Sequence, residues 1–88
     1  MLTRLNPHGF LFTLSSRGED ETRIIHKNKH IDVNHAIDKL NQSWFEWVVK
    51  QHYIQVVFSY LTPEERKFLL TGITPEEWNE MFKDVPDA

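Results

Sequence analysis

The same four residues, Thr-Pro-Glu-Glu, occur twice near the end of the chain, at 62–65 and again at 74–77. In each copy a threonine that can cap a helix precedes a proline suited to the first helical position, and a glutamate stands three residues after the threonine. This is the capping-box pattern, which satisfies backbone N–H groups that lack partners inside the helix. Gly72 suits the left-handed residue that ends a helix. We therefore expect short helices over residues 63–71 and 75–83.

Residues 9–28 show the alternation of strands. Phe10, Phe12 and Leu14 fall on one face of an extended segment. A second extended segment follows at residues 22–27, after a turn-forming stretch that contains Gly18. The pattern predicts a β-hairpin over residues 9–28. Since a lone hairpin is marginally stable in water, it must pack against another element.

Residues 33–61 carry apolar side chains at helical spacing. One row is Val33, Ile37, Leu40, Trp44, Trp47 and Val48, and a second row is Phe45, Val49, Tyr53, Val56 and Tyr60. No turn signal separates the two halves, so the sequence predicts one long or kinked helix that Asp32 or Asn34 caps. Residues 53–61 could alternatively form a strand. The predicted fold is a single α+β domain, residues 1–88, with the hairpin packed on the long helix and followed by the two short helices.

Composition excludes several classes of protein. With 40% hydrophobic and 26% charged residues, the chain has enough apolar material to fold. It has no cysteine, which excludes a disulfide scaffold and fits a reducing compartment. The N-terminus has no apolar signal core, and no apolar run reaches membrane-spanning length. We therefore expect a cytoplasmic protein without membrane contact.

The charge distribution leaves nucleic-acid binding open as an alternative. The net charge is −3; residues 1–50 carry seven Lys/Arg and six Asp/Glu, hence +1, and residues 51–88 carry three and seven, hence −4. A two-stranded ribbon can enter the major groove of DNA and needs few phosphate contacts. The candidate contact residues are Arg17, Arg23, Lys27 and Lys29. Acidic residues 19–21 at the predicted hairpin tip oppose this alternative.

No catalytic or metal site is predicted. His26, His30 and His35 could converge on a metal ion, but neighbouring Lys27 and Lys29 would repel a cation, so surface histidines are the preferred interpretation. A histidine with an acidic orienting residue also needs a nucleophile, and no serine stands in a strand-to-helix elbow. The paired glutamates at the helix starts are explained by capping. We expect a protein that is not an enzyme and has no cofactor.

The aromatic residues of the predicted long helix exceed what one hairpin can cover. Excess apolar area on a small domain marks an interface, and Trp and Tyr are enriched among interface anchors. Symmetric dimers are the commonest self-assemblies. The sequence therefore predicts a module that binds a protein partner and forms a homodimer, in which part of the second apolar row meets another chain. The predicted anchors are Trp44, Trp47, Tyr53 and Tyr60.

Residues 61–78, with the sequence LTPEERKFLLTGITPEEW, resemble the C-terminal segment of short uncharacterised proteins of small phages of the gokushovirus type. The resemblance covers this segment only. It implies a small accessory or host-interaction protein and assigns no catalytic residue.

Overall fold

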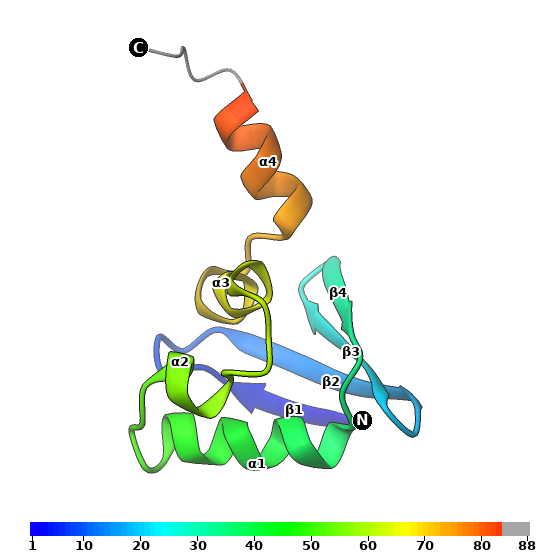
Figure 1. Ribbon diagram of the computed structural model, residues 1–88, viewed down its shortest axis with the longest axis vertical. Coiled ribbons are helices and arrows are strands. Elements are labelled where there is room, and N and C mark those ends of the chain that lie inside the picture. Colours follow the sequence, from blue (N-terminus) through cyan, green and yellow to red (C-terminus); the bar gives the residue numbers. More distant parts are fainter. Residues whose placement is uncertain (84–88) are drawn as a thin grey trace.

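The computed structural model describes residues 1–83 and shows a four-stranded antiparallel sheet followed by four helices (Figure 1). The strands, in the order β1-β2-β3-β4, are β1 (Leu2–Leu5), β2 (Leu11–Gly18), β3 (Glu21–His26) and β4 (Lys29–Val33). The helices are α1 (Ile37–Val48), α2 (Ile54–Val57), α3 (Pro63–Thr71) and α4 (Pro75–Lys83). The predicted α+β class is confirmed. Within residues 1–83, no helix is long and apolar enough to cross a membrane.

The predicted hairpin forms the centre of the sheet, where β2 pairs with β3 and Leu14 lies opposite Ile24. The outer strands β1 and β4 were not predicted. In β4 the buried Ile31 and Val33 alternate with exposed polar residues, so the strand pattern is present but short. β1 has only four residues. Both strands are stabilised by pairing with neighbours that are themselves buried.

One face of the sheet builds the core. Phe12, Leu14 and Ile24 have no exposed surface, because alternate residues of β2 and β3 face the helices. Helices α1, α2 and α3 contribute the other half of a single apolar cluster. Its members are Phe12, Leu14, Ile24, Ile31, Val33, Leu40, Trp44, Trp47, Val57, Phe58, Leu61, Phe68 and Leu69.

The predicted long helix over residues 33–61 is wrong. α1 ends at Val48, and Gln51 has a φ of 57°, which a helix interior does not accommodate. The chain turns back there, so that Phe58 packs edge-on against Trp47, with 5.8 Å between ring centroids. A continuous helix would carry Phe58 away from the sheet, and reversal buries it completely. Residues 54–57 form a helical turn, so helix rather than strand describes this part of the chain.

The predicted cap of that helix is also wrong. Asp32 belongs to β4, and α1 begins after Ala36, which makes no side-chain capping hydrogen bond. Strand pairing extends to Val33, opposite Thr22, and delays the start of the helix.

The two C-terminal helices have the predicted bounds, 63–71 and 75–83. The Thr62 hydroxyl accepts from the Glu65 N–H at 3.1 Å, and the Glu65 carboxylate accepts from the Thr62 N–H at 2.9 Å. Thr74 and Glu77 repeat this reciprocal pair at 3.2 and 3.0 Å. Gly72 ends α3 with a φ of 74°. The duplicated sequence therefore builds two equivalent helix starts.

Asn6 joins the β1–β2 connection to helix α3. Its side-chain oxygen accepts hydrogen bonds from the N–H groups of His8 and Phe10, both at 2.9 Å, which shapes the β1–β2 connection. Its amide nitrogen donates to the carbonyl of Leu69 in α3 at 3.0 Å. Asn6 is 3% exposed, so these bonds satisfy a polar group that would otherwise be costly to bury.

Candidate protein-binding surface

Two of the four predicted anchors lie in the core. Trp44 is 1% and Trp47 is 5% exposed, because the reversal after α1 brings Phe58 against both indoles. The Trp44 indole N–H also donates to the Leu5 carbonyl at 2.9 Å. These side chains therefore offer almost no area to a partner, and the prediction that they anchor an interface does not fit the structure.

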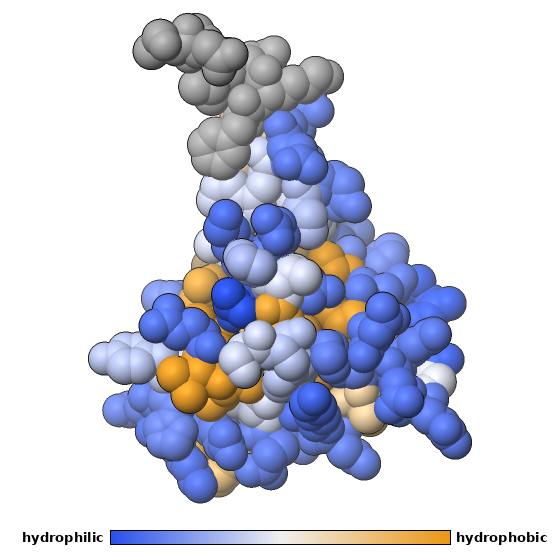
Figure 2. All heavy atoms as spheres, viewed as in Figure 1, coloured by the Kyte–Doolittle hydropathy of each residue, from blue (hydrophilic) through white to orange (hydrophobic). Residues whose placement is uncertain are grey.

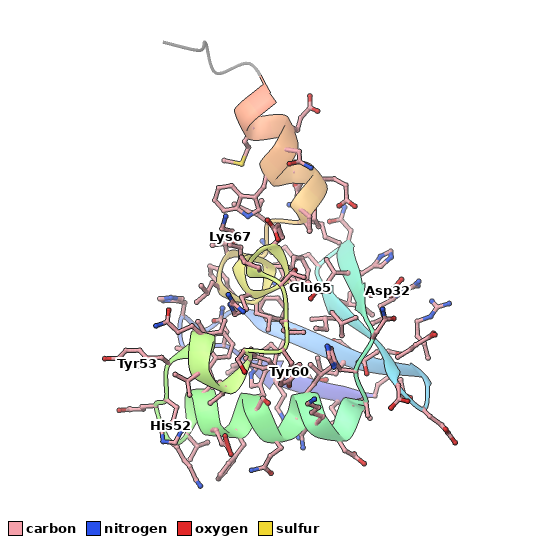
Figure 3. All side chains as sticks on the ribbon, in the orientation of Figure 1. Asp32, His52, Tyr53, Tyr60, Glu65 and Lys67 are labelled. Atoms are coloured by element: carbon pink, nitrogen blue, oxygen red, sulfur yellow. The ribbon has the colours of Figure 1, made fainter. Side chains whose placement is uncertain are left out.

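Tyr60, the third predicted anchor, is half-buried and held by neighbours. Figure 3 places it between α1 and α3. Its hydroxyl lies 2.8 Å from the Ser43 hydroxyl, its ring meets His35 edge-on, and the Lys39 ammonium lies 4.2 Å from the ring centroid. Burial raises the pKa of Tyr60 above its usual value. This cluster is not an activated base, because the neutral phenol is favoured and the ammonium lies over the ring face.

Tyr53 is the predicted anchor that the structure exposes. Its side chain is 76% exposed and points away from the body of the molecule (Figure 3). Val56 next to it is 62% exposed, and Phe45 and Val49 at the end of α1 are 48% and 63% exposed. We call these four side chains, Phe45, Val49, Tyr53 and Val56, the α1–α2 surface. All four belong to the second apolar row of the sequence, so the helical spacing of that row is the sequence signal for this surface.

Three hollows adjoin the α1–α2 surface. A groove of about 380 Å³ between β1 and α1 is lined by Thr3, Arg4, Leu5, Asn41, Trp44, Phe45, Val48 and Val49. A second hollow of about 520 Å³ shares Leu5 and Val48 with it and extends to Gln51 and His52. A third, of about 390 Å³, shares Gln51 and His52 and reaches Tyr53 and Val56. Because successive hollows share lining residues, they are neighbours around the C-terminal end of α1.

The edge of β1 beside this groove is partly occupied. The Asn6 N–H bonds back to the Phe10 carbonyl, so the alternate residues Thr3 and Leu5 direct their backbone groups away from β2. The Thr3 carbonyl accepts from the Arg4 guanidinium at 2.8 Å, and the Leu5 carbonyl accepts from Trp44. An added strand would have to displace both donors. The groove therefore suits the apolar face of a helix better than a strand.

One charged residue, Arg4, lines the groove. Arg4 donates to the Asn41 side chain at 3.0 Å, and the Lys50 ammonium lies 6.0 Å from the centroid of Phe45. Glu46 accepts a hydrogen bond from Gln42 at 3.4 Å and acts electrostatically on Tyr60, so it does not belong to the groove.

The four basic residues of the nucleic-acid alternative do not form one stripe. Arg23 pairs with Asp32 at 2.8 Å on the outer face of the sheet, and this hydrogen bond lowers the pKa of the Asp32 carboxyl. Lys29 pairs with Glu77 at 2.8 Å on the helical face. Lys27 lies in the β3–β4 turn with a φ of 58°, and Arg17 lies at the end of β2. Two of the four charges are thus neutralised, on opposite faces.

The three histidines considered as metal ligands also separate. His26 stacks on Phe12, with 4.8 Å between ring centroids, and its Nδ1 lies 2.8 Å from the Leu11 carbonyl oxygen. His30 is exposed on β4, and His35 lies against Tyr60. Among residues 1–83, no three His, Cys, Asp or Glu side chains lie close enough together to hold a metal ion.

Comparisons of this chain with protein-family models, with curated proteins and with solved structures find no match. Its function has to follow from the chemistry of its own surface.

Proposed function

We propose that this chain is a small, non-enzymatic protein-interaction module that self-associates through the α1–α2 surface and the adjoining groove. The observation that carries the proposal is the gathering of Phe45, Val49, Tyr53 and Val56 at the end of α1, each 48% to 76% exposed. Figure 2 shows hydrophobic side chains at the surface over α2, with hydrophilic ones around them. Large apolar side chains exposed near one another on a small domain favour a binding site there.

The size of the surface suits reversible association. Burying one large apolar side chain completely stabilises by roughly 1.5–3 kcal/mol, and these four are already partly buried. Association costs about 4–15 kcal/mol in lost translational and rotational freedom. The surface and its groove together can offset this cost without a large surplus. We therefore expect a dimer that dissociates on dilution.

The proposal places this protein in the cytoplasm. A cysteine-free chain fits the cytoplasm. The resemblance of residues 61–78 to proteins of small phages suggests an accessory or host-interaction role. The nucleic-acid alternative is not carried forward, because Arg23 and Lys29 each pair with a carboxylate.

The test is the mass in solution, by size-exclusion chromatography with light scattering, at several concentrations and at low and high salt. We expect a dimer at high concentration that persists in high salt, because apolar contacts are not screened. Val49→Glu places a charge in the α1–α2 surface and should give the monomer mass. Far-ultraviolet circular dichroism of the variant should stay unchanged, since Val49 is exposed.

The matched control is Asn34→Glu, which adds the same charge at an exposed position before α1. The twelve residues of α1 separate the two positions by ~18 Å along the helix axis. This control should keep the wild-type mass. A Val49→Glu chain that remains dimeric would show that the surface is not the contact.

A further inference from the structure

Strand β4 leaves one edge of the sheet open. The strand order is β1-β2-β3-β4, so β1 and β4 are the edge strands (Figure 1). At the β1 edge, the carbonyls of Thr3 and Leu5 already accept hydrogen bonds from side chains. At the β4 edge, no side chain of residues 1–83 donates to or accepts from the backbone of the strand. β4 is therefore the edge at which another strand can pair.

The turn between β3 and β4 decides which backbone groups face this edge. Residues 27–28 form a two-residue turn, and His26 pairs with Lys29. The pair that closes a two-residue hairpin exchanges both of its backbone hydrogen bonds, and the pattern alternates along the strands from there. The alternate residues His30 and Asp32 therefore direct their N–H and C=O groups away from β3.

The space beside these backbone groups is open. A hollow of about 260 Å³ is lined by residues 30–32 of β4 and, across from them, by Glu65, Pro75 and Glu76 at the starts of α3 and α4 (Figure 3). The side chains of His30 and Asp32 are exposed. An added strand therefore has room at this edge.

We propose that β4 pairs antiparallel with β4 of a second copy of this chain, with His30 of each chain opposite Asp32 of the other, when His30 is positively charged. The two-fold axis passes through Ile31, so all five residues of β4 are paired. The outward N–H and C=O groups of His30 and Asp32 then bond to each other across the axis. This contact is separate from the α1–α2 surface and goes beyond the function proposed above.

The two side chains select this register. Backbone pairing needs an outward-facing residue opposite another, so the register can shift only in steps of two residues. A shift in one direction would place the two copies of His30 opposite each other, and a shift in the other direction the two copies of Asp32. Opposite charges directly across strands attract, and like charges repel. The strand is thus complementary to itself, which favours a second copy as its partner.

Both side chains have capacity for the contact. The side chain of His30 makes no hydrogen bond within residues 1–83. Arg23 donates to both carboxylate oxygens of Asp32, at 2.8 and 3.3 Å. A carboxylate has about four lone-pair sites, so each oxygen can accept a further hydrogen bond. The bond from Arg23 also lowers the pKa of Asp32, so this carboxylate stays charged in mild acid.

The charge of His30 makes the contact depend on pH. The charged groups around it are Asp32 on the same strand, Arg23 on β3, Glu65 on α3 and Glu76 on α4. Joining two copies brings these carboxylates together, and a neutral imidazole does not offset them. A histidine side chain is mostly neutral at about pH 7.5 and mostly charged at about pH 5.5. Self-association at neutral pH therefore reports the α1–α2 surface, and the β4 contact is added in acid.

The experiment uses full-length Val49→Glu chains, in which the α1–α2 contact is disabled, and measures the dimer dissociation constant by light scattering over a dilution series. At about pH 7.5, adding His30→Lys supplies a permanent positive charge. We expect this chain to dimerise more tightly than the Val49→Glu parent, by about 2-fold to about 30-fold for two cross-strand pairs. Adding His30→Gln instead should leave the association as weak as in the parent.

A second measurement repeats the series at about pH 5.5. The Val49→Glu chain should now dimerise, and the chain that also carries His30→Gln should not. Acid also reduces the net charge of −3, because the chain has five histidines. The matched control for this effect is His8→Gln, which removes an exposed histidine from the β1–β2 connection and should leave the acid response intact. The wild-type chain has both contacts in acid and should exceed the dimer mass.

Three outcomes would overturn the proposal. If His30→Lys and His30→Gln give the same dissociation constant at neutral pH, the occupant of the β4 edge is not a second copy. If acid strengthens association of the His30→Gln chain as much as that of its parent, the response arises elsewhere. If the wild-type chain in acid stays at the dimer mass while Val49→Glu dimerises, the two contacts are not separate.

Failure of the α1–α2 surface gives a different result. A chain with both Val49→Glu and His30→Gln that is dimeric at neutral pH would refute that surface as the contact. The comparison of His30→Lys with His30→Gln would still decide the β4 contact.

Discussion

Tyr60 and Gly72 are two residues whose surroundings decide their chemistry. The Tyr60 phenol lies against Ser43, His35 and Lys39, and burial is the largest cause of its raised pKa. The left-handed Gly72 lies against the His26 ring. The burial of Tyr60 sets the pKa of its phenol. The close approach of Gly72 to His26 sets how near α3 lies to the sheet.

The ionisation of Tyr60 can be read directly, because the chain has two tyrosines. In a Tyr53→Phe chain the tyrosinate absorbance reports Tyr60 alone, and we expect its titration above the usual pKa of 10.0. Since the folded chain holds this proton more tightly than the unfolded chain, stability should fall as the pH rises from the unfolded-state pKa to the higher folded-state pKa. A titration at the usual value would show that the phenol is solvated.

Gly72→Ala should lower the free energy of unfolding by about 1–3 kcal/mol, because the residue has a φ of 74°. An added Cβ would also lie 2.5 Å from Cδ2 of His26. Gly9→Ala is the matched control, because Gly9 has a φ of 85° and its Cβ would meet nothing within 4 Å. The excess loss at position 72, measured by urea denaturation, reports the clash with His26. Equal losses in the two variants would mean that the ring moves aside freely.

At the scale of elements, two equivalent capping boxes have different consequences. Thr62 begins α3, whose Phe68 and Leu69 are fully buried in the core. Thr74 begins α4, which projects from the body. Thr62→Ala should therefore lower global stability by about 1 kcal/mol in urea denaturation. Thr74→Ala should leave the global transition nearly unchanged and speed amide hydrogen exchange in α4 alone. Similar losses of global stability in both variants would show that α4 unfolds together with the core.

Local patterns predicted the elements that depend on local chemistry. Capping boxes and a left-handed glycine set the bounds of α3 and α4, and alternation identified β2 and β3. The reversal at Gln51 could not be predicted, because its stability comes from Phe58 packing on Trp44 and Trp47. That contact depends on the tertiary fold and leaves no signal at residues 49–53.

At the scale of the whole molecule, the chain reversal at Gln51 determines which side chains are exposed at the candidate site. The second apolar row contains the exposed residues Phe45, Val49, Tyr53 and Val56, but of these only Tyr53 was among the predicted anchors. The groove beside them depends on Leu5 meeting Trp44, 39 positions away in the sequence. Periodicity along one element cannot predict a hollow between elements so distant in the chain.

The meander of the sheet also has a consequence for folding kinetics. Each strand pairs with its neighbour in sequence, so the sheet closes through short loops, and such local contacts favour fast folding. The bond from Asn6 to the Leu69 carbonyl spans 63 positions, and we expect it to form after the transition state. Asn6→Asp keeps the side-chain oxygen that shapes the β1–β2 connection, loses the donor to α3 and places a carboxylate oxygen against the Leu69 carbonyl, so it destabilises this contact.

In stopped-flow experiments this variant should unfold faster than the wild type and refold at nearly the same rate. A matching slowdown of refolding would place α3 in the folding nucleus. If refolding is unchanged, the N-terminal sheet assembles first, and the hydrogen bond from the Asn6 amide forms after the transition state. This one bond then sets the lifetime of the folded chain, because it slows unfolding without speeding folding.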